Sequence, residues 1–489
     1  MNGPPARSTT GIVGLDDILN GGFTENRMYL VEGDPGSGKT TLALQYLLEG
    51  RKLGEHGLYL TLSESKEELL AGAASHGWSL EGIEIVELNA GEKGLSADEN
   101  LTMYNPSEVE LSETTRAVLE SVERTQPRRV VFDSLSEMRL LAQSSLRYRR
   151  QILALKQFFV GRRCTVLLLD DGTSEGPDLQ LQSIAHGVVT LEQLAPSYGA
   201  ERRRLRVVKF RGSPYRGGYH DFVIAAGGLQ VFPRLIAAEH RSDFPSARLK
   251  SGVDRLDLLL GGGLDRGTSS VFMGPAGSGK STVALRYAIA AADRGEHAVM
   301  FVFDESARTL KARGKALGMS FREGTTAGTV SVRQIDPTEL APGEFAHLVR
   351  EAVAHDHATV VVIDSLNGYL NAMAEERDLT AQLHELLMYL SGQGVCTIMV
   401  VAQHGLLGQI AAPIDTTYLA DSVVLFCYFE DTGRVRKAIS VIKKRSGQHE
   451  ETIRELRICA SGIELSDPLA DFQGVLTGVP VKTQPGSPA

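Results

Sequence analysis

The sequence predicts an α/β protein made of two similar domains in tandem, each with a mostly parallel sheet flanked by helices and a β-rich end. Three observations lead to this expectation. A glycine-rich loop of one type occurs twice, the segments around both loops align without a gap, and Val/Ile/Leu runs alternate with helical patterns in each half. The length of 489 residues also exceeds that of one ordinary domain.

The two halves share the order and the spacing of their landmarks over Thr10–Ser65 and Ser251–Ser306. Lys39 and Lys280 are 241 positions apart (280 − 39 = 241). Duplication of a whole domain explains this match better than convergence on a short loop. We expect the following division of the chain: domain 1 over 1–235, a linker over 236–250, domain 2 over 251–480 and a disordered tail over 481–489.

Each copy reads as strand, glycine-rich loop, helix and further strands. The expected elements of the first copy are strand 27–32, helix 40–54 and strands 57–62, 128–133 and 164–169. Strands over 358–364 and 395–403 occupy the matching places of the second copy. Each copy then closes with β-rich segments, at 187–212 and at 422–447.

The composition argues against several classes of protein. A net charge of −9 argues mildly against a general nucleic-acid binder, which must neutralise phosphates with Lys and Arg. No run approaches the apolar length of a membrane span, and the first residues have no signal-sequence pattern. The four cysteines lack metal or redox spacing and indicate reduced thiols in a cytoplasmic protein. His347, His355 and His357 fit no tetrahedral metal set.

The repeated loop has the pattern G-x4-G-K-[T/S], "GDPGSGKT" in the first copy and "GPAGSGKS" in the second. Small residues let successive backbone N–H groups surround phosphate oxygens, and the following helix presents its N-terminus to the anion. Lys39 and Lys280 are expected on the β- and γ-phosphates of ATP. The predicted ATP-binding residues are Gly33, Gly36, Ser37, Gly38, Lys39, Thr40, Gly274, Gly277, Ser278, Gly279, Lys280 and Ser281.

Magnesium is the expected partner of the bound phosphates. The hydroxyls of Thr40 and Ser281 are candidate ligands. Asp133 and Asp364 each end an apolar strand and precede Ser-Leu, which places a carboxylate beside the loop. The alternative for these two acids is capping of the next helix.

Hydrolysis also requires a carboxylate that polarises water. Glu64 and Glu305 each lie 25 positions after the loop lysine (64 − 39 and 305 − 280) and end the neighbouring strand. Asp304 precedes Glu305, whereas Ser63 precedes Glu64. We therefore expect Glu64, Asp304 and Glu305 to be catalytic, the alternative being acids on a solvated loop.

Together these landmarks resemble the KaiC family of RecA-like P-loop ATPases, over about Thr10 to Pro480. The resemblance rests on both loops, the "SES" and "DES" acids, the "DSL" strand ends, and the segments "VKFRG" and "IKKRSG". It implies two tandem RecA-like domains in a hexameric double ring. It also implies contacts from Lys209, Arg211, Lys443 and Arg445 to ATP bound by a neighbouring chain. The alternative for these four residues is a basic hairpin facing solvent.

The resemblance further implies autophosphorylation in domain 2. The matching stretch is "PIDTTYLADSVVLF", where Thr417 falls on one acceptor position, with Thr416 beside it, and Tyr418 on the other. Asp304 stands where the family has the Glu that activates the acceptor hydroxyl. Tyr418 is a poor substitute for Thr, since its hydroxyl lies farther from the backbone, and Ser63 leaves hydrolysis in domain 1 open.

Only nine residues follow "GVLTGVP", so the activator-binding extension of clock proteins is nearly absent. We therefore expect a non-clock relative in signalling or regulation, with a small KaiB-like protein as a possible partner. Two other classes stay open: a RecA-like DNA motor and a nucleotide-gated scaffold with little hydrolysis. The arginine runs "RYRR" and "ERRRLR" could serve a DNA motor, although the net charge disfavours one.

Overall fold

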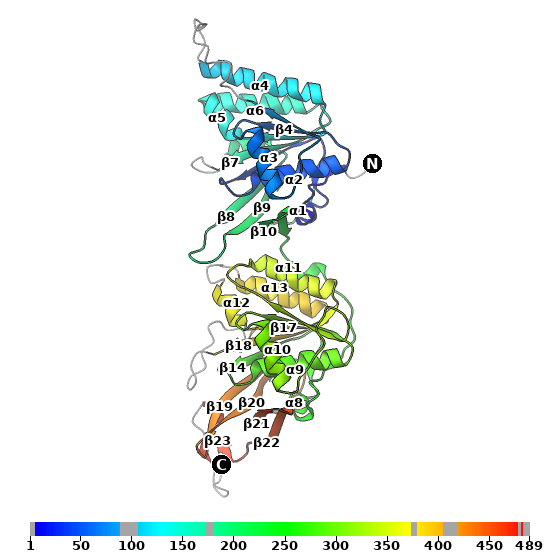
Figure 1. Ribbon diagram of the computed structural model, residues 1–489, viewed down its shortest axis with the longest axis vertical. Helices are drawn as coiled ribbons and strands as arrows, with labels where there is room; N and C mark the ends of the chain where they lie inside the picture. Colours follow the sequence, from blue (N-terminus) through cyan, green and yellow to red (C-terminus); the bar gives the residue numbers. More distant parts are fainter. Residues whose placement is uncertain are drawn as a thin grey trace. The chain divides into compact units, whose positions relative to one another are not determined.

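The structure is a computed structural model that describes residues 5–88, 106–172, 179–372, 379–403, 418–477 and 481–482. The chain divides into two compact units, Met1–Arg234 and Leu235–Ala489 (Figure 1). In the described part of each unit, a nine-stranded sheet carries helices on both faces. The predicted fold class, two tandem α/β domains, is confirmed.

The elements of the first unit follow the predicted order. They are β1 (Arg7–Ser8), α1 (Val13–Ile18), β2 (Phe23–Thr24), β3 (Met28–Gly33), α2 (Lys39–Lys52), β4 (Gly57–Thr61), α3 (Lys66–Ser75), β5 (Ile83–Glu87), α4 (Pro106–Thr125), β6 (Arg129–Asp133), α5 (Leu135–Ala142), α6 (Ser145–Phe159), β7 (Thr165–Asp171), α7 (Leu179–Ile184), β8 (Gly187–Leu194), β9 (Arg202–Phe210), β10 (His220–Ala225) and β11 (Gly228–Phe232).

The second unit repeats this series. Its elements are η1 (Ala237–Glu239), β12 (Arg248–Leu249), α8 (Asp254–Leu259), β13 (Leu264–Asp265), β14 (Ser269–Gly274), α9 (Lys280–Asp293), β15 (His297–Val302), α10 (Ala307–Ala316), β16 (Thr329–Gln334), α11 (Pro342–Ala354), β17 (Ala358–Asp364), α12 (Leu366–Ala372), α13 (Leu379–Gly392), β18 (Cys396–Ala402), β19 (Ser422–Asp431), β20 (Arg434–Lys444), β21 (Ile453–Cys459), β22 (Gly462–Pro468), β23 (Phe472–Gln473), η2 (Val475–Thr477) and β24 (Val481–Lys482).

Both sheets have the same strand order. The first runs β11-β10-β9-β8-β3-β7-β6-β4-β5, and the second, read in the same direction, runs β22-β21-β20-β19-β14-β18-β17-β15-β16. The strand before each loop pairs in parallel on both sides, and the last three strands of each sheet continue it antiparallel. Each glycine-rich loop therefore leaves the middle of its sheet at a carboxyl edge, where ligands of open α/β sheets bind.

The central strands are buried on both faces, which explains their continuous apolar sequences. Successive side chains of a strand point to opposite faces. In β3, Met28 and Leu30 pack into the core under α4, α5 and α6, while Tyr29 and Val31 pack into the core under α1 and α2. The sheet thus separates two apolar cores, and β3 contributes to both.

The stretch 236–250, expected as a linker, falls in the second unit, which begins at Leu235. Ala237 is buried in the core of the second unit, and its backbone N–H donates to Glu385 Oε2 at 3.1 Å. The Ser242 N–H donates to the carbonyl of Gly392 at 3.0 Å. Apolar residues within a polar, proline-containing segment attach it to the second unit. Within the described residues, no helix combines the length and apolar character that crossing a membrane requires.

Candidate functional site

The first loop folds as a phosphate cradle between β3 and α2. Gly36 and Gly38 adopt left-handed φ angles of 82° and 101°. At Gly38 this φ strains any residue with a side chain, and a Cβ would also lie 2.7 Å from Ile224 Cδ1, so glycine is favoured. The Ser37 hydroxyl is buried and has no hydrogen-bond partner within the described residues. A cradle of glycines with an unsatisfied hydroxyl fits an anion with oxygen acceptors.

Lys39 is the first residue of α2, and its side chain folds back over the loop. Its Nζ donates to the carbonyls of Gly33 at 2.7 Å and Asp34 at 2.9 Å. The same amine lies 2.8 Å from Asp171 Oδ1, although only 7% of the Lys39 side chain is exposed. The lysine is therefore already positioned at the loop, with a carboxylate as its counter-ion.

The predicted magnesium ligands of domain 1 lie together. Thr40 Oγ1 is 3.5 Å from Asp133 Oδ2, and the Tyr59 hydroxyl donates to the same oxygen at 2.5 Å. Burial raises the pKa of Asp133, and the Tyr59 hydrogen bond opposes this rise. A buried carboxylate with an adjacent hydroxyl is the oxygen-rich chemistry that Mg²⁺ prefers.

Glu64 follows β4 on the short turn that leads into α3. The turn is held by Thr61, whose Oγ1 donates to the Glu64 carbonyl at 2.7 Å and accepts from its N–H at 3.0 Å. Ser65 and Glu68 form a capping box that starts α3. Burial, and next the charge of Asp133, raise the pKa of Glu64.

The second loop repeats the cradle. Gly277 and Gly279 have φ angles of 75° and 109°, and a Cβ on Gly277 would lie 2.7 Å from the Tyr428 hydroxyl oxygen. Ser278 Oγ donates to the carbonyl of Pro275 at 2.8 Å. Lys280 Nζ donates to the carbonyls of Gly274 at 2.8 Å and Pro275 at 2.6 Å. Burial lowers the pKa of Lys280 to about 8, because the charged form loses its hydration.

The acids of domain 2 also gather at the carboxyl edge of the sheet. Burial raises the pKa of Asp364, and a hydrogen bond from Ser281 opposes the rise. Glu305 forms an ion pair of 3.0 Å with Arg313. The Ser365 hydroxyl donates to Asp304. Asp304, Glu305 and Asp364 thus lie near one another at this edge.

Comparison with known proteins agrees with this doubled geometry. The sequence model of the family described as "ATPase: KaiC" matches residues 8–236 and again residues 249–470. The chain belongs to the KaiC family. The circadian clock oscillator protein KaiC of Thermostichus vulcanus is 25% identical over 483 residues, covering 97% of this chain and 91% of that protein. KaiC3 of a Synechocystis strain is 24% identical, covering 97% of this chain and 94% of the relative.

The four basic residues predicted to reach a neighbouring chain lie away from the loops of their own KaiC domains. Lys209 pairs in β9 with Val188, which pairs with Leu30 three residues before Gly33. Lys209 is thus two strands away from β3 and about 10 Å back along it. Lys443 lies opposite Val423, which pairs with Val271 at the same level of β14.

Backbone carbonyls of the same domain hold these cations in place. Lys209 Nζ donates to the carbonyls of Gln182 at 2.5 Å and Ala185 at 2.7 Å. Arg211 Nη2 donates to the carbonyl of Ser183 at 2.9 Å. In the second domain, Lys443 donates to the carbonyl of Ala420 at 2.8 Å, and Arg445 to that of Tyr418 at 2.9 Å.

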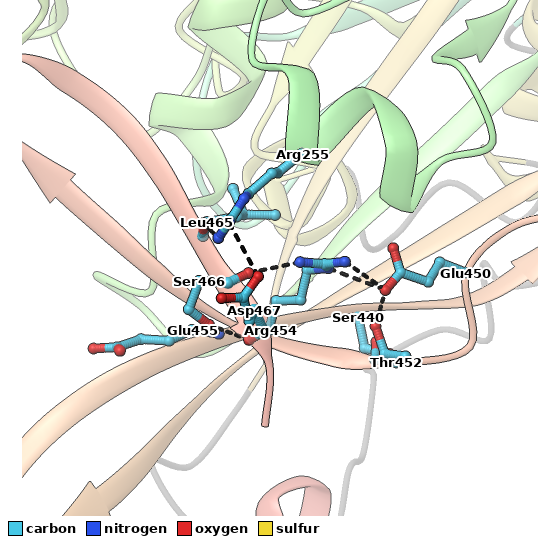
Figure 2. A network of polar contacts seen from close by, with 9 residues as sticks. All are labelled: Arg255, Ser440, Glu450, Thr452, Arg454, Glu455, Leu465, Ser466 and Asp467. Atoms are coloured by element: carbon cyan, nitrogen blue, oxygen red, sulfur yellow. Dashed lines mark hydrogen bonds and ion pairs between the residues drawn. The ribbon is translucent and has the colours of Figure 1, made fainter. Parts of the chain in front are cut away.

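The loop that carries Arg445 is fixed at both ends. At its start, Lys444 is fully buried and donates to the carbonyl of Leu260 at 2.6 Å, with Asp265 Oδ2 at 3.2 Å. At its far end, Figure 2 shows Arg454 between Glu450 and Ser466, with 2.7 Å to Glu450 Oε1 and 2.7 Å to the Ser466 carbonyl.

Around this pair the other residues of Figure 2 tie neighbouring strands together. Ser440 donates to the carbonyl of Thr452 at 3.1 Å, and the Glu455 N–H donates to Ser466 Oγ at 2.9 Å. Arg255 donates to the carbonyl of Leu465 at 2.9 Å and pairs with Asp467 at 3.0 Å. The basic loop is therefore held by a rigid support.

The predicted phospho-acceptors Thr416 and Thr417 lie outside the described residues, so their placement stays a prediction. Tyr418, the next residue, is about half exposed at 53%. Asp421, on the acid position of the same stretch, accepts from the N–H of Ser269 at 2.9 Å and so stabilises the start of β14.

Three side chains at the sites were not singled out from the sequence: Tyr59, Asp171 and Arg313. Asp171 ends an apolar strand, the same signal that identified Asp133, and could have been found by it. Tyr59 lies within an apolar strand, and Arg313 lies eight residues after Glu305 on a polar helix. No pattern in the sequence distinguishes these two residues from ordinary core and surface residues.

Proposed function

We propose that both KaiC domains bind ATP with magnesium and hydrolyse it, in a hexameric double ring where a neighbouring chain completes each site. The observation that carries this proposal is a division of labour within each domain. Loop lysine, hydroxyl and acids converge at one end of the central strand, whereas a fixed pair of cations lies toward its other end. Neither end is a complete site for phosphoryl transfer by itself.

Within one domain the residues have distinct roles. The loop backbone and the lysine bind the phosphates, and Thr40 with Asp133, or Ser281 with Asp364, hold the metal. Magnesium, when bound, offsets phosphate charge and orients the phosphate oxygens. Glu64 and Glu305 accept a proton from the attacking water, and the raised pKa of Glu64 favours this role at neutral pH.

The cationic surface around Arg211 supports its role toward a neighbour. A hollow there is lined by Asn26, Arg27, Met28, Lys156, Phe159, Val160, Cys164, Ile184, His186 and Arg211. Four of these ten residues are basic or imidazole side chains, and none is acidic. Such a surface attracts a polyanion presented by another chain.

Mixing of variants tests the shared site. One chain lacks both loop lysines (Lys39→Ala with Lys280→Ala), and the other lacks both distal arginines (Arg211→Ala with Arg445→Ala). Each alone is expected to turn over ATP at a small fraction of the native rate, and the mixture to recover part of it. Sedimentation with and without Mg-ATP reports the assembly. If the arginines act within their own chain, the mixture recovers no ATP turnover. A chain that stays monomeric with ATP bound contradicts the proposed ring.

We further propose that domain 2 transfers phosphate to Thr417 or Thr416, with Asp304 activating the hydroxyl. The Ser365 hydroxyl donates a hydrogen bond to the Asp304 carboxylate and holds it beside Asp364. Incubation with γ-labelled ATP followed by peptide mapping tests the step. Label is expected on the peptide containing 416–418, absent from Lys280→Ala and from the double Thr→Ala variant. Release of free phosphate without label leaves an ATPase without kinase activity.

The clock names of the curated relatives support a role in signalling or regulation, with a small KaiB-like protein as the candidate partner. A binding titration with a purified KaiB-like protein in ATP and in ADP tests this part. Nucleotide-dependent binding supports it. Equal weak binding in both nucleotides argues against a regulated partner.

A further inference from the structure

Asp171 has no place in the motifs of the sequence, yet it touches the loop lysine of domain 1. It is the last residue of β7, where the strand register pairs it with Gly33 at the start of the loop. Its Oδ1 lies 2.8 Å from Lys39 Nζ, with the Lys39 side chain 7% and the Asp171 side chain 29% exposed. A carboxylate oxygen therefore occupies a position on the amine that a phosphate oxygen takes in a loop of this type.

The carboxylate is held from its other side as well. Ser136 Oγ donates to Asp171 Oδ2 at 2.9 Å. The two oxygens of Asp171 thus have two different partners, one on the loop lysine and one on α5. Ser136 therefore gives the carboxylate a second anchor that does not depend on Lys39.

Domain 2 lacks this acid. Ala402 ends β18 and pairs with Gly274, the register position that Asp171 has in domain 1. Lys280 Nζ donates to the carbonyls of Gly274 and Pro275. Within the described residues, no ion pair to Lys280 is formed. The two sites therefore differ in whether the loop lysine already has an anionic partner.

We propose that Asp171 sets the nucleotide affinity of domain 1: its carboxylate competes with the triphosphate for Lys39, so that domain 1 binds ATP more weakly than domain 2. The inference rests on the proposed ATP binding at both loops.

The competition has a chemical consequence for the choice of nucleotide. When a triphosphate replaces Asp171 as the partner of Lys39, the Asp171 carboxylate stays next to the terminal phosphate. The two negative groups then repel each other. A diphosphate presents one charged group fewer at this end. Asp171 therefore weakens ATP binding more than ADP binding, which favours the diphosphate state of domain 1 relative to domain 2.

Equilibrium titration of the full chain with fluorescent ATP and ADP analogues tests the proposal. The Lys280→Ala background leaves domain 1 as the binding site. In that background, Asp171→Asn removes the charge with little change of shape. We expect ATP to bind roughly five- to tenfold more tightly, and ADP by a smaller factor. Glu84→Gln is the matched control, because Glu84 pairs with Arg124 on the surface and loses the same charge.

The outcomes separate three cases. An unchanged or weakened ATP affinity of Asp171→Asn, or a gain equal to that of Glu84→Gln, overturns the inference. Lost hydrolysis without tighter binding also overturns it and makes Asp171 a catalytic acid instead. If the Lys280→Ala chain binds no nucleotide at all, the proposed function of domain 1 has failed before Asp171 is tested.

The converse variant places the acid in domain 2. In the Lys39→Ala background, Ala402→Asp puts a carboxylate at the same register position beside Gly274. We expect weaker ATP binding by a similar factor, with thermal unfolding of the free chain as the check on folding. A folded Ala402→Asp variant with native ATP affinity contradicts the proposal.

Discussion

The two KaiC domains have the same sheet and loop but different charges around the loop lysine. Domain 1 places Asp171 on Lys39, whereas domain 2 has Ala402 at that position and adds Arg313 beside Glu305. Applying the offset of 241, Arg313 corresponds to Gly72 (313 − 241 = 72). One duplicated scaffold thus has a site with an added acid and a site with an added cation.

The largest expected effect concerns the candidate bases. Glu64→Gln and Glu305→Gln remove a proton acceptor from each domain and keep its shape. We expect each to lower the hydrolysis of its own domain on the order of 100-fold, with ATP affinity nearly unchanged. Single-turnover assays in the Lys280→Ala and Lys39→Ala backgrounds separate the domains. If only one substitution slows turnover, the two domains differ in chemistry and not only in affinity.

A smaller effect is expected from Arg313. Its charge lowers the pKa of Asp364 against the larger rise caused by burial. Removing the Arg313 charge raises the pKa of Asp364. Asp364 then becomes protonated at a higher pH than in the native chain, and the protonated carboxyl binds metal poorly. In the Lys39→Ala background, Arg313→Ala is expected to weaken Mg-ATP binding by up to roughly fivefold, and by more at pH 6 than at pH 8.

The control for Arg313 is Arg308→Ala, which removes the same charge from an exposed position of α10. Titrations of both variants at pH 6, 7 and 8 measure the change. An identical pH dependence of the two variants shows that Arg313 has no specific influence on the metal site.

The smallest expected effect is the uptake of a fraction of a proton by Lys280 when nucleotide binds. Lys280 has a pKa of about 8 in the free protein, below its ordinary value of 10.5. A bound polyphosphate favours the charged form and raises that pKa, so binding takes up protons. We expect uptake of roughly 0.7 proton at pH 8.5 and roughly 0.1 at pH 7, because the free amine is already charged at the lower pH.

Calorimetry of the Lys39→Ala chain in buffers of different ionisation enthalpy measures this uptake. Lys280→Arg serves as the control, since a guanidinium stays charged at both pH values. Equal uptake at pH 7 and pH 8.5 in the Lys39→Ala chain would show that burial does not weaken the charge of Lys280.

The sequence predicted the fold and the positions of the residues that belong to a motif. The loops, Thr40 with Asp133, and the strand-end position of Glu64 depend on local order and strand direction, both readable from apolar runs. The contact between Asp171 and Lys39 depends on which strand lies beside β3. Strand order across a sheet is set by long-range packing, which the sequence pattern does not show. The ion pair between Arg313 and Glu305 depends on the direction that α10 takes after the loop acids. The contacts of Ala237 in the segment 236–250 depend on long-range packing as well.

The register of Lys209 and Lys443 also bears on the ring that we propose. Within each domain the phosphate end and the cation end of the central strands face away from each other. A head-to-tail interface joins the unlike ends of neighbouring chains, and it closes into a ring when the rotation between chains divides a full turn. The direction of a few strands is thus compatible with the ring that we propose.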